Sequence, residues 1–333
     1  DSSSGSGERS SLVPKPGDEK AYQAMLLKTG VYHAAGLCAP ELLEHLKQHV
    51  SFQGWFRTSL AKEIQSKQSF AKPLRERAVW LVGEVCRGEA LHPGMWSEVF
   101  GSVCACLSAD NDFAVQMSSV VCLNWLLEKQ PRDQNPSSIS KTMLVLCRGL
   151  LKMVSRANQL ESQRNVLNTL LTVIRRMDTN AHEPMVKVVQ EHFGPLWTSS
   201  QRTLLQADLL GVLEALVLAL GPRSALLTAQ MIPILRDTLP SKTSGSDHLS
   251  VPSTRLLLAL AATQAPKVHQ DVAKGLLASV QRITDQSFLD QIKNMVSLQE
   301  FEDLKVALQC VEVFGIIAPF NTLQPYMEKV ASA

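Results

Sequence analysis

The chain has 333 residues, of which 45% are hydrophobic and 19% charged, with a formal net charge of +2. This is a globular composition, long enough for two conventional domains or for one elongated array. A net charge so close to zero provides no basic surface for duplex DNA or for an anionic membrane, so we expect neither nucleic acid nor membrane as a partner. Only 5% of the residues are aromatic, which favours helices packed through Leu, Ala and Val over sheets.

The cysteines and the N-terminal residues indicate a soluble intracellular protein. The seven cysteines form no C-x-x-C pair and each lies in an apolar helical run, so we predict buried free thiols in place of disulfides or a zinc site. They are Cys38, Cys86, Cys104, Cys106, Cys122, Cys147 and Cys310. The opening DSSSGSGERSS has no apolar signal segment and resembles an internal linker, so we expect a piece of a larger protein.

In the first half of the chain, helices are predicted after a Ser- and Gly-rich linker over 1–17 that we expect to be disordered. The clearest helix follows Pro73, with Leu74, Ala78, Leu81 and Val85 spaced to share one apolar face. Asp112 and the two residues before it can cap the helix that follows them. The predicted ranges are 18–37 with a start or kink at Pro40 and continuation to 50, then 52–65, 73–87, 94–107, 113–128 and, after a loop over 131–136, 138–155.

The second half repeats the same pattern, with a break at Gly221-Pro222 and Ser224 as the cap of the next helix. The longest internal loop is predicted over 240–252 and is polar enough to be flexible. The predicted helices are 161–177, 184–196, 202–220, 224–238, 253–262, 267–282, 285–295, 300–317 and 321–333.

The spacing of these helices predicts a repeat protein, and no convincing strand appears. Taken in pairs, the first helices begin near 73, 113, 161, 202, 253 and 300, a period of about 40 to 50 residues that is typical of HEAT or armadillo hairpins. The predicted fold class is therefore all-α. We expect a right-handed α-solenoid of about seven helical hairpins, forming a single domain over 18–333.

Several stretches resemble the importin-β-type karyopherins, within them the branch that contains importin eleven. VYHAAGLCAPELLEHL, FQGWFRTSLAKEIQ and KPLRERAVWLVGEV are similar to consecutive helices from the middle of such a receptor. LSADNDFAVQMSSVVCLNWLL and the run from FGPLWTSSQ to MIPIL agree with it, so the match spans much of 31–235. Gln116 stands where such repeats often carry Arg, which predicts an interruption of the polar ladder between repeats.

The resemblance implies a central segment of a nuclear transport receptor. Such a receptor binds a cargo protein and Phe-Gly nucleoporins, and its Ran GTPase contacts lie mainly in repeats outside this segment. It implies a monomer in nucleus and cytoplasm and at the nuclear envelope, with no cofactor and no catalytic residue. No cargo-, Ran- or nucleoporin-binding position is carried over. The alternative is a HEAT or armadillo scaffold or adaptor of another class, such as a phosphatase regulatory subunit, a vesicle-coat adaptor or a tubulin-handling protein.

The motifs typical of enzymes and metal sites are weak. His45 and His49 are four residues apart beside Glu41 and Glu44, a spacing that could serve one metal ion, but a solvated helix face is favoured because no third ligand follows. Cys104 and Cys106 diverge on a helix. Neither a G-x-S-x-G elbow nor a phosphate-binding glycine loop occurs, so we do not expect an enzyme.

Three features have both a binding and a structural interpretation. The tryptophans either form shallow pockets for Phe-Gly peptides or, as we favour, wedge repeat against repeat; they are Trp55, Trp80, Trp96, Trp125 and Trp197. Trp80 lies off the Leu74 face and would need a second neighbouring helix to be buried. A basic cluster of Lys72, Arg75 and Arg77, beside Arg57 and Lys62, could meet an acidic partner or belong to solvated helix ends. The run 209–220 is either buried on both sides, as we favour, or partly an exposed groove.

Overall fold

The computed structural model describes residues 19–49, 51–68, 71–88, 91–107, 112–129, 139–176, 182–200, 203–238 and 249–264, with the single positions 272 and 309. Every regular element in these residues is helical, which confirms the all-α prediction. The predicted linker over 1–17, the loop over 131–136, most of the loop over 240–252 and the helices predicted beyond 264 lie outside the described residues.

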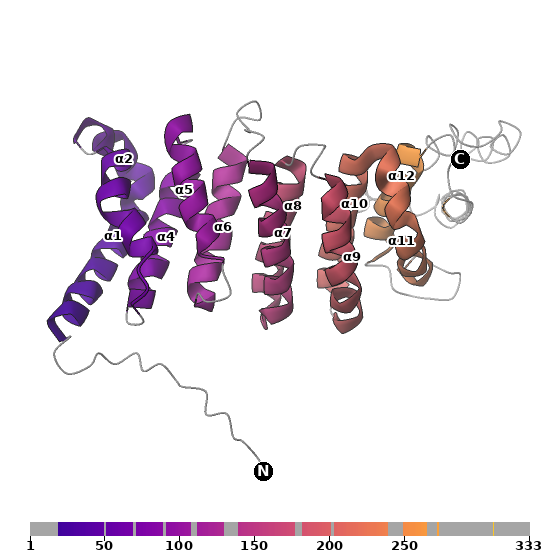
Figure 1. Cartoon of the computed structure of the whole chain (residues 1–333), viewed down its shortest axis with the longest axis horizontal. Coiled ribbons are helices and arrows are strands. Elements are labelled where there is room, and N and C mark those ends of the chain that lie inside the picture. Colours follow the sequence, from indigo (N-terminus) through magenta and orange to yellow (C-terminus); the bar gives the residue numbers. More distant parts are fainter. Residues whose placement is uncertain are drawn as a thin grey trace, which may run out of the picture. The chain divides into compact units, whose positions relative to one another are not determined.

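The first compact unit extends to Met153 and contains a row of three helices packed side by side. In this row α4 lies between α1 and α6, while α3 contacts α4 and α5 (Figure 1). The elements are α1 (Glu19–His49), α2 (Phe52–Trp55), the π-helical turn η1 (Phe56–Leu60), α3 (Ala61–Ile64), α4 (Lys72–Gly88), α5 (Pro93–Ala105), α6 (Phe113–Lys129) and α7 (Ile139–Arg156), whose last residues pass into the second unit.

The second compact unit begins at Val154 and has a row of the same kind. Here α10 packs against both α8 and α12, and α11 packs against α12. The elements are α8 (Leu160–Arg176), α9 (His182–Ser199), α10 (Thr203–Leu220), the 3-10 turn η5 (Gly221–Ser224), α11 (Ala225–Thr238) and α12 (Ser250–Gln264).

The row helices recur with the predicted period. Helices α4, α6, α8, α10 and α12 begin at residues 72, 113, 160, 203 and 250, close to the predicted starts. Within each unit every row helix packs on the next one, as expected of stacked hairpins that cannot bury their apolar faces alone. The HEAT-type α-solenoid is thereby confirmed as the fold class. The continuity of the repeats from one unit to the next stays a prediction.

The core of the first unit is centred on α4. Leu74, Ala78, Leu81 and Val85 are all buried, as predicted from their spacing. Four more residues of the helix are buried as well, namely Val79, Val82, Gly83 and Cys86. The buried face is wider than predicted because α4 has a row neighbour on each side.

Three local details differ from the sequence prediction. Helix α1 runs through Pro40 without ending. The helix predicted over 52–65 contains a π-helical turn, in which the Ala61 N–H donates to the Phe56 carbonyl and the Thr58 hydroxyl donates to the Gly54 carbonyl at 2.8 Å. Helix α12 starts at Ser250 and not at Ser253, since a proline such as Pro252 is tolerated in a first turn.

Candidate interaction surfaces

Trp80 of α4 packs against α1. Its indole lies where a side chain at Gly36 would be, because a Cβ atom there would approach Cζ3 to 2.2 Å. The His33 ring lies 5.3 Å from the indole, and the Arg77 guanidinium lies 5.3 Å from the ring centroid in a cation–π contact. Helix α1 is therefore the second neighbour that the position of Trp80 required.

Two other tryptophans also join different elements. The buried Trp96 of α5 donates its Nε1–H to the Leu126 carbonyl of α6 at 3.1 Å. Trp55 meets the Tyr32 ring of α1 edge to face at 5.8 Å. The prediction that tryptophans wedge repeat against repeat thus describes Trp80 and Trp96, whereas Trp55 contacts its neighbour within one hairpin. Trp197 stacks on Phe193 of its own helix at 6.0 Å, and Trp125 is half-buried.

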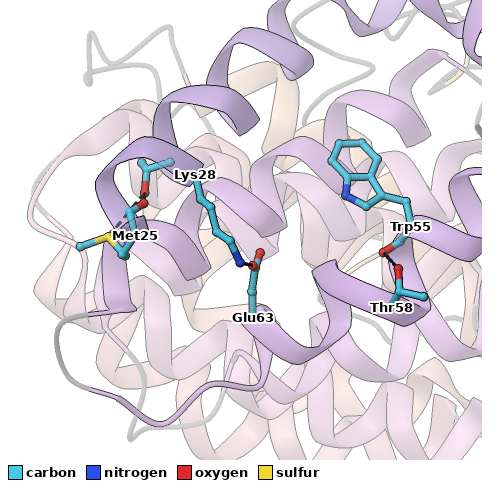
Figure 2. Close-up of polar contacts among 6 residues, drawn as sticks. Met25, Lys28, Trp55, Thr58 and Glu63 are labelled. Atoms are coloured by element: carbon cyan, nitrogen blue, oxygen red, sulfur yellow. Dashed lines mark hydrogen bonds and ion pairs between the residues drawn. The ribbon is translucent and has the colours of Figure 1, made fainter. Parts of the chain in front are cut away.

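An ion pair ties α1 to α3, as Figure 2 shows. Lys28 Nζ lies 2.8 Å from Glu63 Oε1, with the lysine exposed and the glutamate nearly buried. Burial raises the pKa of Tyr32 well above its ordinary value, and the adjacent Glu63 carboxylate raises it further. In the same view the Thr58 hydroxyl lies within hydrogen-bonding distance of the Trp55 carbonyl. The Lys28–Glu63 ion pair therefore links α1 to α3.

Most members of the predicted basic cluster contact other groups of the same chain. Arg75 Nε donates to the Ile64 carbonyl at 3.1 Å, and Lys62 is exposed. The other members face carboxylates: Lys72 with Asp112 (3.8 Å), Arg77 with Glu76 (3.3 Å) and Arg57 with Glu98 (2.8 Å). Asp112 also accepts from the Ala114 N–H, as predicted for a cap. The cluster therefore offers little free positive charge to an acidic partner.

A series of polar residues, here called the junction residues, was missed by the sequence analysis. Each is the fourth residue of a row helix and reaches the end of the preceding helix, where carbonyls lack helical partners. The contacts are Arg75 to Ile64 O (3.1 Å), Gln116 to Leu107 O (3.4 Å), Gln163 to Val154 O (3.3 Å), Gln206 to Ser200 O (3.0 Å) and Ser253 to Thr238 Oγ1 (2.7 Å).

Gln116 is thus one member of this series and no interruption, which corrects the prediction made from the resemblance. Its side chain is fully buried, and its amide nitrogen donates to the Leu107 carbonyl, as the Arg75 guanidinium does to the Ile64 carbonyl. In the sequence, one polar residue recurs once per repeat at this position, but its type changes from Arg to Gln to Ser. The series therefore cannot be recognised from residue type alone.

Polar bridges also cross from one row helix to the next at equivalent positions. The Ser118 hydroxyl donates to Glu76 Oε1 at 2.8 Å between α6 and α4. Arg164 Nε lies 2.6 Å from Asp208 Oδ2 between α8 and α10. Farther along α10, burial raises the pKa of Glu214, while Arg255 of α12 and Arg175 of α8 act in the opposite direction. Polar and charged side chains thus link successive row helices within each unit.

Most of the 209–220 run is buried, as expected from the sequence. Seven of its residues are in the core: Leu209, Leu210, Val212, Leu213, Leu216, Val217 and Leu220. Leu218 and Leu204 are each more than half exposed. By length and composition the segment Thr203–Leu235 could span a membrane, but 44% of its most apolar window is buried and core helices of soluble proteins have the same features.

The candidate metal ligands and thiols give one correction. His45 and His49 belong to α1, but their side chains, and those of Glu41 and Glu44, lie outside the described set. Within the residues that can be described, no three His, Cys, Asp or Glu groups could share a metal ion. Cys38 is exposed, so the prediction of a buried thiol is wrong there; Cys86, Cys106, Cys122 and Cys147 are buried and form no disulfide.

Burial has a chemical consequence for these thiols. It raises the pKa of Cys104 to about 12, and it raises that of Cys147 to about 12 as well. The thiolate is the reactive form of cysteine. The raised pKa values lower the fraction of thiolate at these two positions. Cys310 lies outside the described residues.

Comparison with known proteins finds similarity to two importins and to a solved importin-β structure. No protein-family model matches the chain. It is 24% identical to human importin-11 over 354 residues, covering 94% of this chain and 35% of that protein, and 28% identical to mouse importin-11 over 226 residues, covering 66% and 22%. The structure of yeast importin-β has the same fold, with a TM-score of 0.52 at 13% identity, over 95% of this chain and 44% of that one. The chain thus spans about a third or less of the length of the curated relatives.

Proposed function

We infer that this importin-β-type karyopherin chain, of the importin-11 branch, is a segment of a nuclear transport receptor. The observation that carries the inference is the similarity to human importin-11 over 94% of the chain. The stacked hairpins support it, because an array of this kind presents a long surface to protein partners. The relatives are importins, so the chain acts by binding and not by making or breaking bonds.

Cargo protein and Phe-Gly nucleoporins are the proposed partners, and Ran GTPase would act mainly through repeats outside this segment. The stacked repeats would change curvature in small steps, since each contacts only its neighbours. Ran could alter cargo affinity only if the two shapes make different contacts with cargo. The receptor would work as a monomer that moves between cytoplasm and nucleus through the nuclear envelope.

The row surfaces suit a protein partner of mixed character. Around Trp80 an aromatic ring lies beside Arg77. Helix α10 carries the exposed Leu204 and Leu218 as well as Asp208 of the Arg164–Asp208 pair. Such combinations of apolar, aromatic and arginine side chains are enriched in protein interfaces. These surfaces are the proposed contact points for cargo.

Binding of Phe-Gly repeats to the purified chain tests the proposal. Immobilised Phe-Gly repeats should retain the chain, and repeats in which every Phe is replaced by Ser should not, since the phenyl group supplies the apolar contact. Retention on both resins, or on neither, would contradict the assignment of nucleoporin binding to this segment.

A HEAT scaffold of another class is the second candidate, and one observation favours it. Several charges of the row helices pair with each other, as in Arg164 with Asp208 and Arg77 with Glu76, and the formal net charge of the chain is only +2. A scaffold would bind a protein partner without affinity for Phe-Gly repeats. The same binding experiment therefore separates the two candidates.

A further inference from the structure

All the charged residues of helix α7 are basic. Its sequence contains Lys141, Arg148, Lys152 and Arg156 and neither Asp nor Glu. These four positive charges exceed the net charge of +2 of the whole chain, so the rest of the sequence is slightly acidic. Helix α4, by comparison, has two carboxylates among its four basic residues. The unbalanced positive charge of the chain is therefore concentrated on α7.

Three exposed residues of α7 in the first unit lie on one side of the helix. Val145, Arg148 and Lys152 are three and four residues apart, which is the spacing of one helix face. All three are exposed, Val145 by 69%, and we call them the basic face. Leu146 and Leu150, on the opposite side of the helix, are buried. Core packing therefore fixes the position of the basic face before any partner binds.

Arg148 and Lys152 form no ion pair with any described carboxylate. The ion pairs of the described chain use cations of other elements, namely Lys28, Arg57, Lys72, Arg77, Arg87 and Arg164. Gly149 follows Arg148 directly, and nothing lies within 4 Å of the place that its Cβ would occupy. The basic face thus has both the charge and the room for contact with another molecule.

The composition of the basic face favours a protein partner over a nucleic acid or a membrane. Nucleic acids are bound through larger clusters of Lys and Arg, whereas the basic face has two cations beside an exposed valine. A bilayer requires several large apolar side chains on the exposed side of a helix, and Val145 is the only one among the exposed residues described for α7. An acidic protein segment that includes an apolar side chain complements both the cations and Val145.

We propose that the basic face of α7 binds a short acidic segment of a partner protein. Asp or Glu side chains of the partner would pair with Arg148 and Lys152, and an apolar side chain would contact Val145. Exposed ion pairs each contribute little and are screened by salt, so the contact should be weak and salt-dependent and should mainly speed association. The proposal goes beyond transport and does not depend on Phe-Gly binding, because Phe-Gly repeats supply no carboxylate for these cations.

Fluorescence anisotropy of a short labelled peptide of Glu, Asp and Leu, mixed with the 333-residue chain at low salt, tests the proposal. Arg148→Glu/Lys152→Glu should bind the peptide at least about fivefold more weakly than the parent, since two attractions become repulsions. Lys62→Glu/Lys67→Glu, at two exposed lysines of the same unit, changes the net charge by the same amount and should bind like the parent. An equal loss in both double variants, or no binding by the parent, would overturn the proposal.

Further measurements on the parent chain need no variant. Binding of the acidic peptide should weaken as salt is added, and a peptide with Gln and Asn in place of Glu and Asp should not bind. Equal binding of the two peptides would show that charge is not what is recognised and would overturn the proposal. A single-stranded oligonucleotide and vesicles that contain phosphatidylserine are the other probes. Tighter binding of either one than of the acidic peptide would overturn the assignment to a protein partner.

Discussion

At the scale of single residues, the closest fit in the described chain is that of Gly36 with Trp80. A Cβ atom at Gly36 would come within 2.2 Å of Cζ3 and 2.6 Å of Cη2 of the indole, distances that non-bonded carbon atoms do not reach. The indole can move only by leaving its contacts with His33 and Arg77. Position 36 therefore accepts glycine alone without rearrangement.

Gly36→Ala should lower the free energy of unfolding by about 1 to 3 kcal/mol, the usual range for overpacking a tight contact. Urea denaturation followed by circular dichroism would measure the change. Gly101→Ala is the control, because its Cβ would meet nothing within 4 Å and alanine is the better helix former. Equal effects of the two substitutions would show that the wedge is looser than described.

Glu214 provides a residue-scale prediction about pH. Burial raises its pKa above the ordinary value of 4.5, so the unfolded carboxyl loses its proton at lower pH than the folded one. The protonated Glu214 carboxyl therefore stabilises the folded chain below pH 4.5, and this stabilisation is lost as pH rises through the raised pKa. Glu214→Gln should therefore melt higher than the parent at pH 7, with the difference vanishing near pH 4. Glu191→Gln, at an exposed site of α9, should have little effect; a Glu214→Gln protein that melts lower at pH 7 would show that Arg255 and Arg175 outweigh burial.

At the scale of elements, each helix is held by its neighbours in the row and by the junction residues. Sequence periodicity predicted the apolar face of α4, because residues three and four apart share a helix face whatever lies opposite. The junction contacts could not be predicted in the same way. A buried glutamine is interpretable only when the carbonyl that it meets, such as Leu107 O, is known.

Leu81→Asp should destabilise the first unit by about 3 to 5 kcal/mol, since it buries a carboxylate with no partner. Leu81 is 1% exposed and belongs to α4, which packs against both α1 and α6. Helical circular dichroism during thermal unfolding would record the loss. Leu218→Asp, at a leucine that is more than half exposed in α10, should melt like the parent. A Leu81→Asp protein that does the same would contradict the assigned core.

Gln116→Leu should cost about 1 to 3 kcal/mol, because it removes the buried donor and leaves the part-buried Leu107 carbonyl without this hydrogen bond. Hydrogen exchange should speed up at the end of α5, and the urea midpoint should fall. Gln190→Leu in α9 is exposed and should change neither quantity. Unchanged exchange in α5 would show that the junction contact carries no stability.

At the scale of the whole molecule, the two compact units contain the same row motif, and their repeats differ in detail while keeping the period. Stability in such an array is a sum over repeats and their nearest-neighbour contacts. A mutation in one repeat should therefore change mainly the stability of that repeat and of the repeats next to it. This property is consistent with the proposed role of a receptor that adjusts its curvature to a partner.

If the repeats continue from one unit to the next, the 333-residue chain should be elongated in solution. Small-angle scattering should then give a radius of gyration well above the value of about 20 Å for a compact chain of this length, with a strongly helical circular dichroism spectrum. A compact scattering profile would contradict the prediction of one continuous domain over 18–333.

The sequence by itself determined the helices, their period and the apolar face of α4, because these depend on residues close together along the chain. The resemblance to karyopherins came from the same local patterns. Only the tertiary structure decided that Gly36 receives Trp80 and that the basic cluster is largely paired. It alone revealed that Arg148 and Lys152 of α7 pair with no described carboxylate. Those facts depend on which distant segments meet, and a linear pattern shows that a face is apolar without showing what covers it.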